Sequence, residues 1–212
     1  CHTDTIFHSF QNQALIVYSP FNVVLQNKII EGNVILISDQ KIVVRSSASV
    51  SSAIFYAKEI LIEKETKGNM QLFAQDSIVI EENTHLIYPS TVALIQKGRI
   101  KNTSSINIHN DVKIQGIVVL YNEVGDKKYP GIISIGEQTE ITGKVYSSNT
   151  LELKGTVNGS VYCKRFLLKT ASSIYENHLM GATINRLKLP EYFIGAALVK
   201  TTKRQSIIKW VN

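Results

Sequence analysis

Short apolar alternations recur at a near-fixed interval in this sequence, and this repeat constrains the fold more than any other feature. Ile42-Val43-Val44, Ile60-Leu61-Ile62 and Ile78-Val79-Ile80 begin at positions 42, 60 and 78, a period of eighteen, and Val24 lies one period before Ile42. The register near Val23 and Val24 is ambiguous by one position. The pattern returns at Ile106-Asn107-Ile108 and Ile133-Ser134-Ile135, and Leu151-Glu152-Leu153 follows one period later. A fixed period of this length predicts one structural unit per repeat, stacked on its neighbours.

Each unit has the pattern of short strands and corners. Apolar residues alternate in runs of about three to five, which indicates strands with one buried face. The chain has 28 Ile, 18 Val and 14 Thr, so 60 of its 212 residues are β-branched and favour strands. No unit carries a helical pattern of ten residues, which excludes alternating strands and helices. Eighteen residues cover three short strands and three corners, one coil of a triangular β-solenoid. A β-sandwich remains the alternative, because its turns at intervals of about 8–12 residues produce a similar spacing.

The details of the repeat favour a right-handed coil. Left-handed β-helices share this period, but they are built from strict hexapeptides with a small residue after the aliphatic one. Here Glu63 and Glu81 follow the second aliphatic residue, and Phe55, Phe73 and Tyr121 fall inside strands. The expected fold is all-β, a single-stranded right-handed parallel β-helix of seven to nine coils over residues 14–177.

The alternation predicts which side chains fill the core. We expect twelve residues to point inward in stacked ladders: Ile42, Val44, Ile60, Ile62, Ile78, Ile80, Ile106, Ile108, Ile133, Ile135, Leu151 and Leu153. Two later units also agree in their internal spacing. Ile114 and Gly116 occupy the same places in one unit as Ile141 and Gly143 occupy in the next.

Two stretches break the period. Residues 89–105 add about ten residues beyond one coil, and residues 122–131 read as a polar loop at a corner. Long loops on solenoids often carry binding residues, although tolerated insertions are as simple an explanation. The second loop makes Lys127, Lys128 and Tyr129 candidate partner-binding residues.

The last part of the chain loses the repeat and predicts a C-terminal cap or docking segment over residues 178–212. An uncovered solenoid end exposes strand edges and aliphatic side chains. We expect Tyr192–Val211 to fold back over the last coil and bury Trp210, with Lys200, Lys203 and Arg204 in solvent. Such a cap would block end-to-end association at that end. The alternative is a docking tail, with these basic residues and Trp210 as its partner-binding residues.

Residues 1–13 are expected to form a lead-in to the solenoid. The sequence begins at Cys1, which allows two interpretations: the lipid-modified first residue of a mature bacterial lipoprotein, or an arbitrary boundary. Asp4-Thr5-Ile6 resembles the short O-glycosylation signal of Bacteroidetes envelope proteins, which makes Thr5 a candidate modification site.

The sequence carries no pattern that indicates catalysis or a bound cofactor. Its five histidines are scattered, no two of them are four positions apart, and none has metal-ligand spacing to a cysteine or carboxylate. Cys163 has the pattern of a free strand cysteine. The net charge of +6 comes without a nucleic-acid-binding motif, so we expect no nucleic-acid partner. No apolar stretch is long enough for a membrane-spanning helix. We expect a protein that is not an enzyme and uses no cofactor or metal.

Three phrases carry a resemblance to a known family. Val112–Ile117, Thr139–Val145 and Leu151–Val161 each place glycine between aliphatic residues at two-residue spacing. This resembles the bactofilin, or polymer-forming cytoskeletal, family of triangular right-handed β-helices. The resemblance implies end-to-end self-association without nucleotide and a scaffolding role in the bacterial cell envelope.

Together these features predict a non-catalytic scaffold or assembly component of the cell envelope, with protein partners or further copies of itself. Anchoring to a membrane through the N-terminus is part of this expectation, and a cytoplasmic cytoskeletal location is the alternative. The rival function is a surface or extracellular β-helix that binds or acts on glycans.

Overall fold

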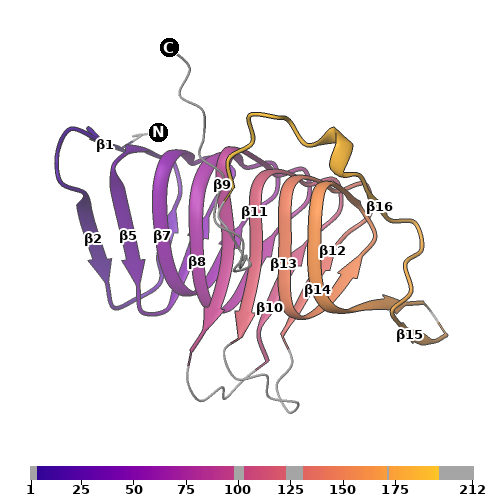
Figure 1. Ribbon diagram of the computed structural model, residues 1–212. Coiled ribbons are helices and arrows are strands. Elements are labelled where there is room, and N and C mark those ends of the chain that lie inside the picture. Colours follow the sequence, from indigo (N-terminus) through magenta and orange to yellow (C-terminus); the bar gives the residue numbers. More distant parts are fainter. Residues whose placement is uncertain (1–3, 98–102, 123–130, 171, 196–212) are drawn as a thin grey trace.

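The computed structural model describes residues 4–97, 103–122, 131–170 and 172–195, which form an all-β parallel solenoid (Figure 1). The first coil consists of β1 (Asp4–His8), β2 (Leu15–Ser19) and β3 (Val23–Leu25). The second consists of β4 (Lys28–Gly32), β5 (Val34–Ser38) and β6 (Lys41–Val44). The third and fourth are the continuous strands β7 (Ser49–Ile62) and β8 (Lys67–Ile80).

The remaining coils continue this arrangement. The fifth is β9 (His85–Gln96) with β10 (Ser105–Ile108), and the sixth is β11 (Lys113–Asn122) with β12 (Ile132–Ile135). The seventh and eighth are β13 (Glu140–Leu153) and β14 (Thr156–Lys169). Strands β15 (Ile174–Glu176) and β16 (Thr183–Ile184) and the short 3₁₀ helix η1 (Arg186–Lys188) follow. Eight coils, within the predicted range, therefore account for residues 4–169 where the structure describes them.

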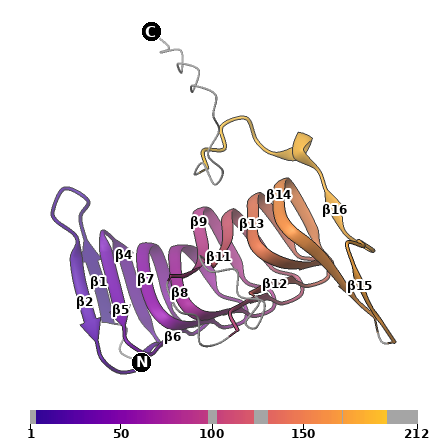
Figure 2. The same cartoon turned by 60° about the horizontal axis from the view of Figure 1, so that its bottom comes forward.

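Each coil contributes one segment to each of three outer faces. Strand β7 shows this directly, because it pairs in parallel with β4, then β5, then β6 along its length. We call these the first face (β1, β4 and the segments stacked on them), the second face (β2 and β5) and the third face (β3 and β6). The coils advance side by side along one axis, as Figures 1 and 2 show.

The predicted core is confirmed. All twelve inward residues are buried, none with more than 2% of its surface exposed. Ile42 is in register with Ile60, Ile60 with Ile78 and Ile78 with Ile106, and the ladder continues through Ile133 to Leu151. The ambiguity at the start is resolved in favour of Val23, which pairs with Ile42, whereas Val24 points outward beside Val43.

The first insertion has the predicted size, but its extra residues are divided between two places. Strand β9 continues to Gln96, so much of the predicted 89–105 insertion belongs to the coil. A regular coil separates paired residues by eighteen positions. Phe73 pairs with Ala93, which is twenty positions later, and Ile78 pairs with Ile106, which is twenty-eight positions later. Two extra residues therefore form a bulge before Thr91, and eight more follow the strand. The second insertion falls after Asn122, as predicted, and both insertions leave the second face at the same corner, because Gln96 pairs with Asn122.

Glycines build the corner that precedes the second face. Gly116, Gly143 and Gly159 are stacked in register, with φ between +149° and +157°. A Cβ at Gly143 would lie 1.8 Å from the carbonyl oxygen of Gly116. These positions need glycine because the backbones of successive coils approach too closely for any side chain.

The C-terminal segment differs from the expected fold-back over the last coil. Strand β15 pairs antiparallel with the end of β14, and β16 pairs in parallel with its start. After η1 the chain returns along the side of the solenoid, where Phe193 lies against Gly143 and the ring of Tyr88. The prediction that Tyr192 helps to cover the last coil is wrong, since 81% of its surface is exposed. Trp210, Lys200, Lys203 and Arg204 lie outside the described residues.

The N-terminal lead-in is also part of the solenoid. Strand β1 pairs with β4, and Ile6 packs against the core, so residues 4–8 belong to the first coil. The stacking of Ile6 on Ile30 extends the hydrophobic core by one coil, which explains why this segment is ordered as a strand. Among the residues that the structure describes, no helix is long and apolar enough to cross a membrane.

Candidate functional site

The second face carries the most distinctive surface of the described chain. Its central outward position is aromatic or aliphatic in all eight coils: Tyr18, Ile37, Tyr56, Phe73, Ala93, Val119, Tyr146 and Tyr162 are in register from first to last. We call this set the apolar row. Three isoleucines, Ile16, Ile35 and Ile54, widen it on one side over the first three coils. Outward positions of a sheet that faces water are normally polar, so this row is a candidate interaction surface.

The other two faces are more polar. On the first face, Lys67, His85, Lys113 and Glu140 succeed one another in one outward column. The third face has an aliphatic column, Val24, Val43, Leu61 and Val79, that ends at Asn107 and Ser134. Ion pairs flank that column on both sides, Lys41 with Glu59 and Arg45 with Glu63. The apolar row is therefore longer than any comparable feature on the described surface.

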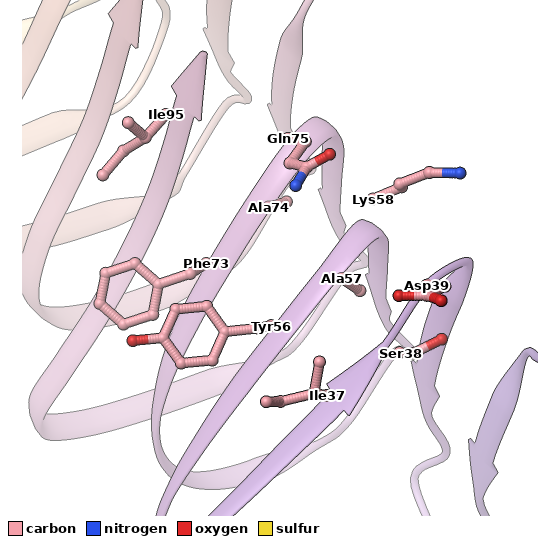
Figure 3. A pocket seen from close by; sticks show the side chains of 10 residues that line it. All are labelled: Ile37, Ser38, Asp39, Tyr56, Ala57, Lys58, Phe73, Ala74, Gln75 and Ile95. Carbon is pink, nitrogen blue, oxygen red and sulfur yellow. The ribbon is translucent and has the colours of Figure 1, made fainter. Parts of the chain in front are cut away.

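A shallow depression of about 280 Å³ lies across the second to fifth coils of the second face (Figure 3). The rings of Tyr56 and Phe73 stack in it with centroids 4.9 Å apart and planes 16° apart. Ile37 and Ile95 lie at its two ends, and Asp39, Lys58 and Gln75 line one side. Because the rings stack along the solenoid axis, they present their edges outward and cover one another's faces.

One hydrogen bond fixes the start of the row. The hydroxyl of Tyr18 donates to Oδ2 of Asp39 at 2.6 Å. This bond, with further contributions from desolvation and from the carboxylate charge, raises the pKa of Tyr18 above its ordinary value. The hydrogen bond from Tyr18 to Asp39 links the first coil to the second.

A second candidate surface is the N-terminal end of the solenoid. The inward residues Ile6, Leu15, Val17 and Val23 remain partly exposed. Their partners one coil further on, Ile30, Val34, Leu36 and Ile42, are all at most 5% exposed. Within the described residues, β1, β2 and β3 each pair with a strand on one side only. This end thus presents unpaired strand edges around an open hydrophobic core.

The residues that could hold a metal or perform acid–base chemistry are dispersed over the described chain. No group of three or more His, Cys, Asp or Glu within it could hold a metal ion. Oε1 of Glu82 lies 3.0 Å from Nδ1 of His109, and both side chains are exposed. A backbone hydrogen bond within Glu82, supported by His109, lowers the pKa of the Glu82 carboxyl. Cys163 is a free, half-buried cysteine, and desolvation raises the pKa of its thiol.

The structure places one of the candidate residues from the sequence. Thr5 is exposed in β1, beside the ion pair of Asp4 with Lys28. Cys1 and the loop residues Lys127, Lys128 and Tyr129 lie outside the described residues. The sequence reasoning missed the apolar row, although a signal was present. Runs such as Ile35-Leu36-Ile37 and Ile117-Val118-Val119-Leu120 are continuously apolar, which places apolar side chains on both sides of a strand.

Comparisons with protein-family models, with curated proteins and with solved structures find no match to this chain.

Proposed function

We propose that this protein is a non-catalytic scaffold or assembly component of a bacterial cell envelope, a bactofilin-like right-handed β-helix that associates through its N-terminal end. The observation that carries the proposal is the open core at that end. Leu15 keeps 36% of its surface exposed, whereas Val34, stacked on it, keeps 2%. Covering the open core with a second apolar surface would remove this exposed patch from water, which favours association.

Right-handedness has two lines of support. Strands β2 and β5 run downward on the nearer side of Figure 1 while the chain advances from left to right, which is the sense of a right-handed coil. The large side chains inside the strands agree with this sense. We further propose that β15 and β16 act as the C-terminal cap, because they pair with both ends of the strand β14. Association would then be restricted to the opposite end.

The strand edges at the N-terminal end favour protein as the partner. Backbone N–H and C=O groups of β1, β2 and β3 can extend the three sheets by pairing with strands of another chain. Their side chains add the apolar contact. The envelope location in this proposal rests on the resemblance of the glycine-containing phrases to the scaffold family.

The test is a charge placed in the open core. Leu15→Lys puts an ammonium group at the centre of the proposed contact, while its exposure in the free protein lets the charge remain in water. The control is Thr5→Lys, which adds the same charge to an outward position of the same coil. Sedimentation velocity over a range of concentrations should show association by the native chain and by Thr5→Lys, and its loss or reduction in Leu15→Lys.

Melting curves of the three proteins should agree closely, so that altered association is separate from altered folding. If Leu15→Lys assembles as readily as the native chain, the N-terminal end is not the contact and the proposal fails.

Glycan binding is the second candidate, and the depression at Tyr56 favours it because Asp39, Lys58 and Gln75 supply hydrogen-bonding groups there. The stacking of Tyr56 on Phe73 opposes it, since sugar rings bind to exposed aromatic faces rather than to ring edges. Titration calorimetry with envelope oligosaccharides distinguishes the two functions, and saturable binding lost in Tyr56→Ala would support the glycan alternative.

A further inference from the structure

From the continuity of the apolar row we infer that the second face is a lateral interface between two copies of this chain, separate from the N-terminal end. The inference deepens the proposed function, on which it rests, by naming a second contact and its occupant. Tyr18, Tyr56 and Tyr162 keep 59%, 41% and 46% of their surfaces exposed, so the row is accessible in the first, third and last coils, whereas Ala93 in the fifth coil keeps only 3%. None of its eight members is charged.

The size of the face matches what a stable dimer needs. Seven spacings of about 4.8 Å give a row about 34 Å long. The row and its two neighbouring outward columns span about 14 Å along the strands, or about 20 Å with their side chains. Each copy would therefore cover roughly 700 Å², and two copies roughly 1,400 Å², within the range of specific protein interfaces.

The shape of the face favours a second copy over other occupants. A stack of parallel coils presents a flat, regular sheet surface, and a flat sheet packs best against another flat sheet about 10 Å away. A two-fold axis along the strand direction would lay the row of one copy on the row of the other with the solenoid axes antiparallel. Phe73 and Ala93, in the fourth and fifth coils, would then lie at the two-fold axis.

The chemistry of the rings points the same way. Tyr56 and Phe73 present edges outward, and ring edges interdigitate well with the aliphatic side chains of a facing row. The aliphatic residues that can receive these ring edges lie on either side of the two rings along the solenoid axis. Ile37 precedes Tyr56, and Ile95 and Val119 follow Phe73. The hydroxyl of Tyr18 is already satisfied by its hydrogen bond to Asp39.

The experiment separates the lateral contact from the end contact by working in the Leu15→Lys chain, in which the end contact is removed. That variant of the 212-residue chain should form a discrete dimer in sedimentation equilibrium at physiological salt. Tyr56→Lys added to it should weaken the dimer at least tenfold, because an isologous interface receives the new charge twice. Tyr121→Lys, at a position in register with Ile95 on the same face, should act in the same direction.

Ile87→Lys is the matched control. Ile87 keeps 42% of its surface exposed, against 41% for Tyr56 and 40% for Tyr121, but it lies in the bulge of β9 between Leu86 and Ser90, away from the row. The control should leave the dimer unchanged. Equal melting temperatures for the three lysine variants would show that folding is preserved.

Several results would overturn the inference and leave the end contact standing. One is a Leu15→Lys chain that is monomeric at every concentration, and another is a dimer that survives both Tyr56→Lys and Tyr121→Lys. A third is a monomeric chain that dimerises only after residues 196–212 are removed, which would assign the row to the chain's own C-terminal segment. A different result would contradict the proposed function, namely that the chain with the single substitution Leu15→Lys assembles as readily as the native chain.

Discussion

Replacing Ile60 with alanine tests the inward ladder, because its neighbour Leu61 provides a control of the same size. Ile60 is 1% exposed and stacks between Ile42 and Ile78, whereas Leu61 points outward from the third face. Both substitutions remove three carbon atoms from adjacent positions of β7. They differ only in the side of the strand from which the atoms are lost.

The expected cost of Ile60→Ala follows from transfer and cavity contributions. Three carbons at about 0.8 kcal/mol each give about 2.4 kcal/mol of lost transfer free energy. The space left behind adds up to about 2 kcal/mol, at about 24 cal/mol per Å³ for a void of roughly 80 Å³. Flanking coils on both sides limit relaxation, so we expect a loss of about 3–4 kcal/mol. Leu61→Ala should cost about 1 kcal/mol, because Leu61 already contacts water.

Urea unfolding followed by circular dichroism measures both variants. The urea concentration at the unfolding midpoint should fall, while the slope of the unfolding free energy against urea concentration should stay the same. This combination would show that the stability has changed and the unfolded state has not. A loss of about 1 kcal/mol or less for Ile60→Ala, or a larger loss for Leu61→Ala, would refute the register, because a slip of one residue exchanges the two sides of a strand.

Three further predictions follow from the corners and surface charges. Gly143→Ala should cost about 2–4 kcal/mol in urea unfolding, because its Cβ would meet the carbonyl oxygen of the preceding coil at 1.8 Å. Glu65 has φ +62°, so Glu65→Asn should raise the melting temperature by relieving left-handed strain, whereas Glu63→Asn, without a positive φ, should not. Glu82 has a lowered pKa in the folded chain, so its carboxylate adds stability above its unfolded pKa, and that stability is lost as the pH falls through the folded value. Melting curves of Glu82→Gln and the native chain should therefore differ at neutral pH and converge in strong acid, below both pKa values.

The core of this protein can be read from the amino-acid sequence alone. Alternation assigns one side of each strand to the interior, and on the third face the spacing from Ile42 to Ile60 and from Ile60 to Ile78 is a constant eighteen positions. A period carried by large aliphatic residues can be read directly, because burial leaves no other residue type at those positions. The twelve predicted core residues are buried for this reason.

The corners that carry glycine were also readable, since Gly116 and Gly143 occupy equivalent places in their units. The structure at the ends of the solenoid could not be predicted from the sequence. Whether a segment such as Phe193 covers the last coil or returns to Tyr88 depends on contacts between residues far apart in the chain. Those contacts have no signature in a local pattern, so the expected fold-back of Tyr192 was wrong.

The outward side chains that share a row are known only once the strands are paired in three dimensions. Along the second face the spacing is nineteen positions from Ile37 to Tyr56, seventeen from Tyr56 to Phe73 and twenty from Phe73 to Ala93. Bulges at the corners change the spacing on this face while the core of the third face keeps its period. If the eighteen-residue period of the core is applied to this face, these residues do not line up. The apolar row therefore appears only when the strands are paired, and the surface that we propose for association depends on that pairing.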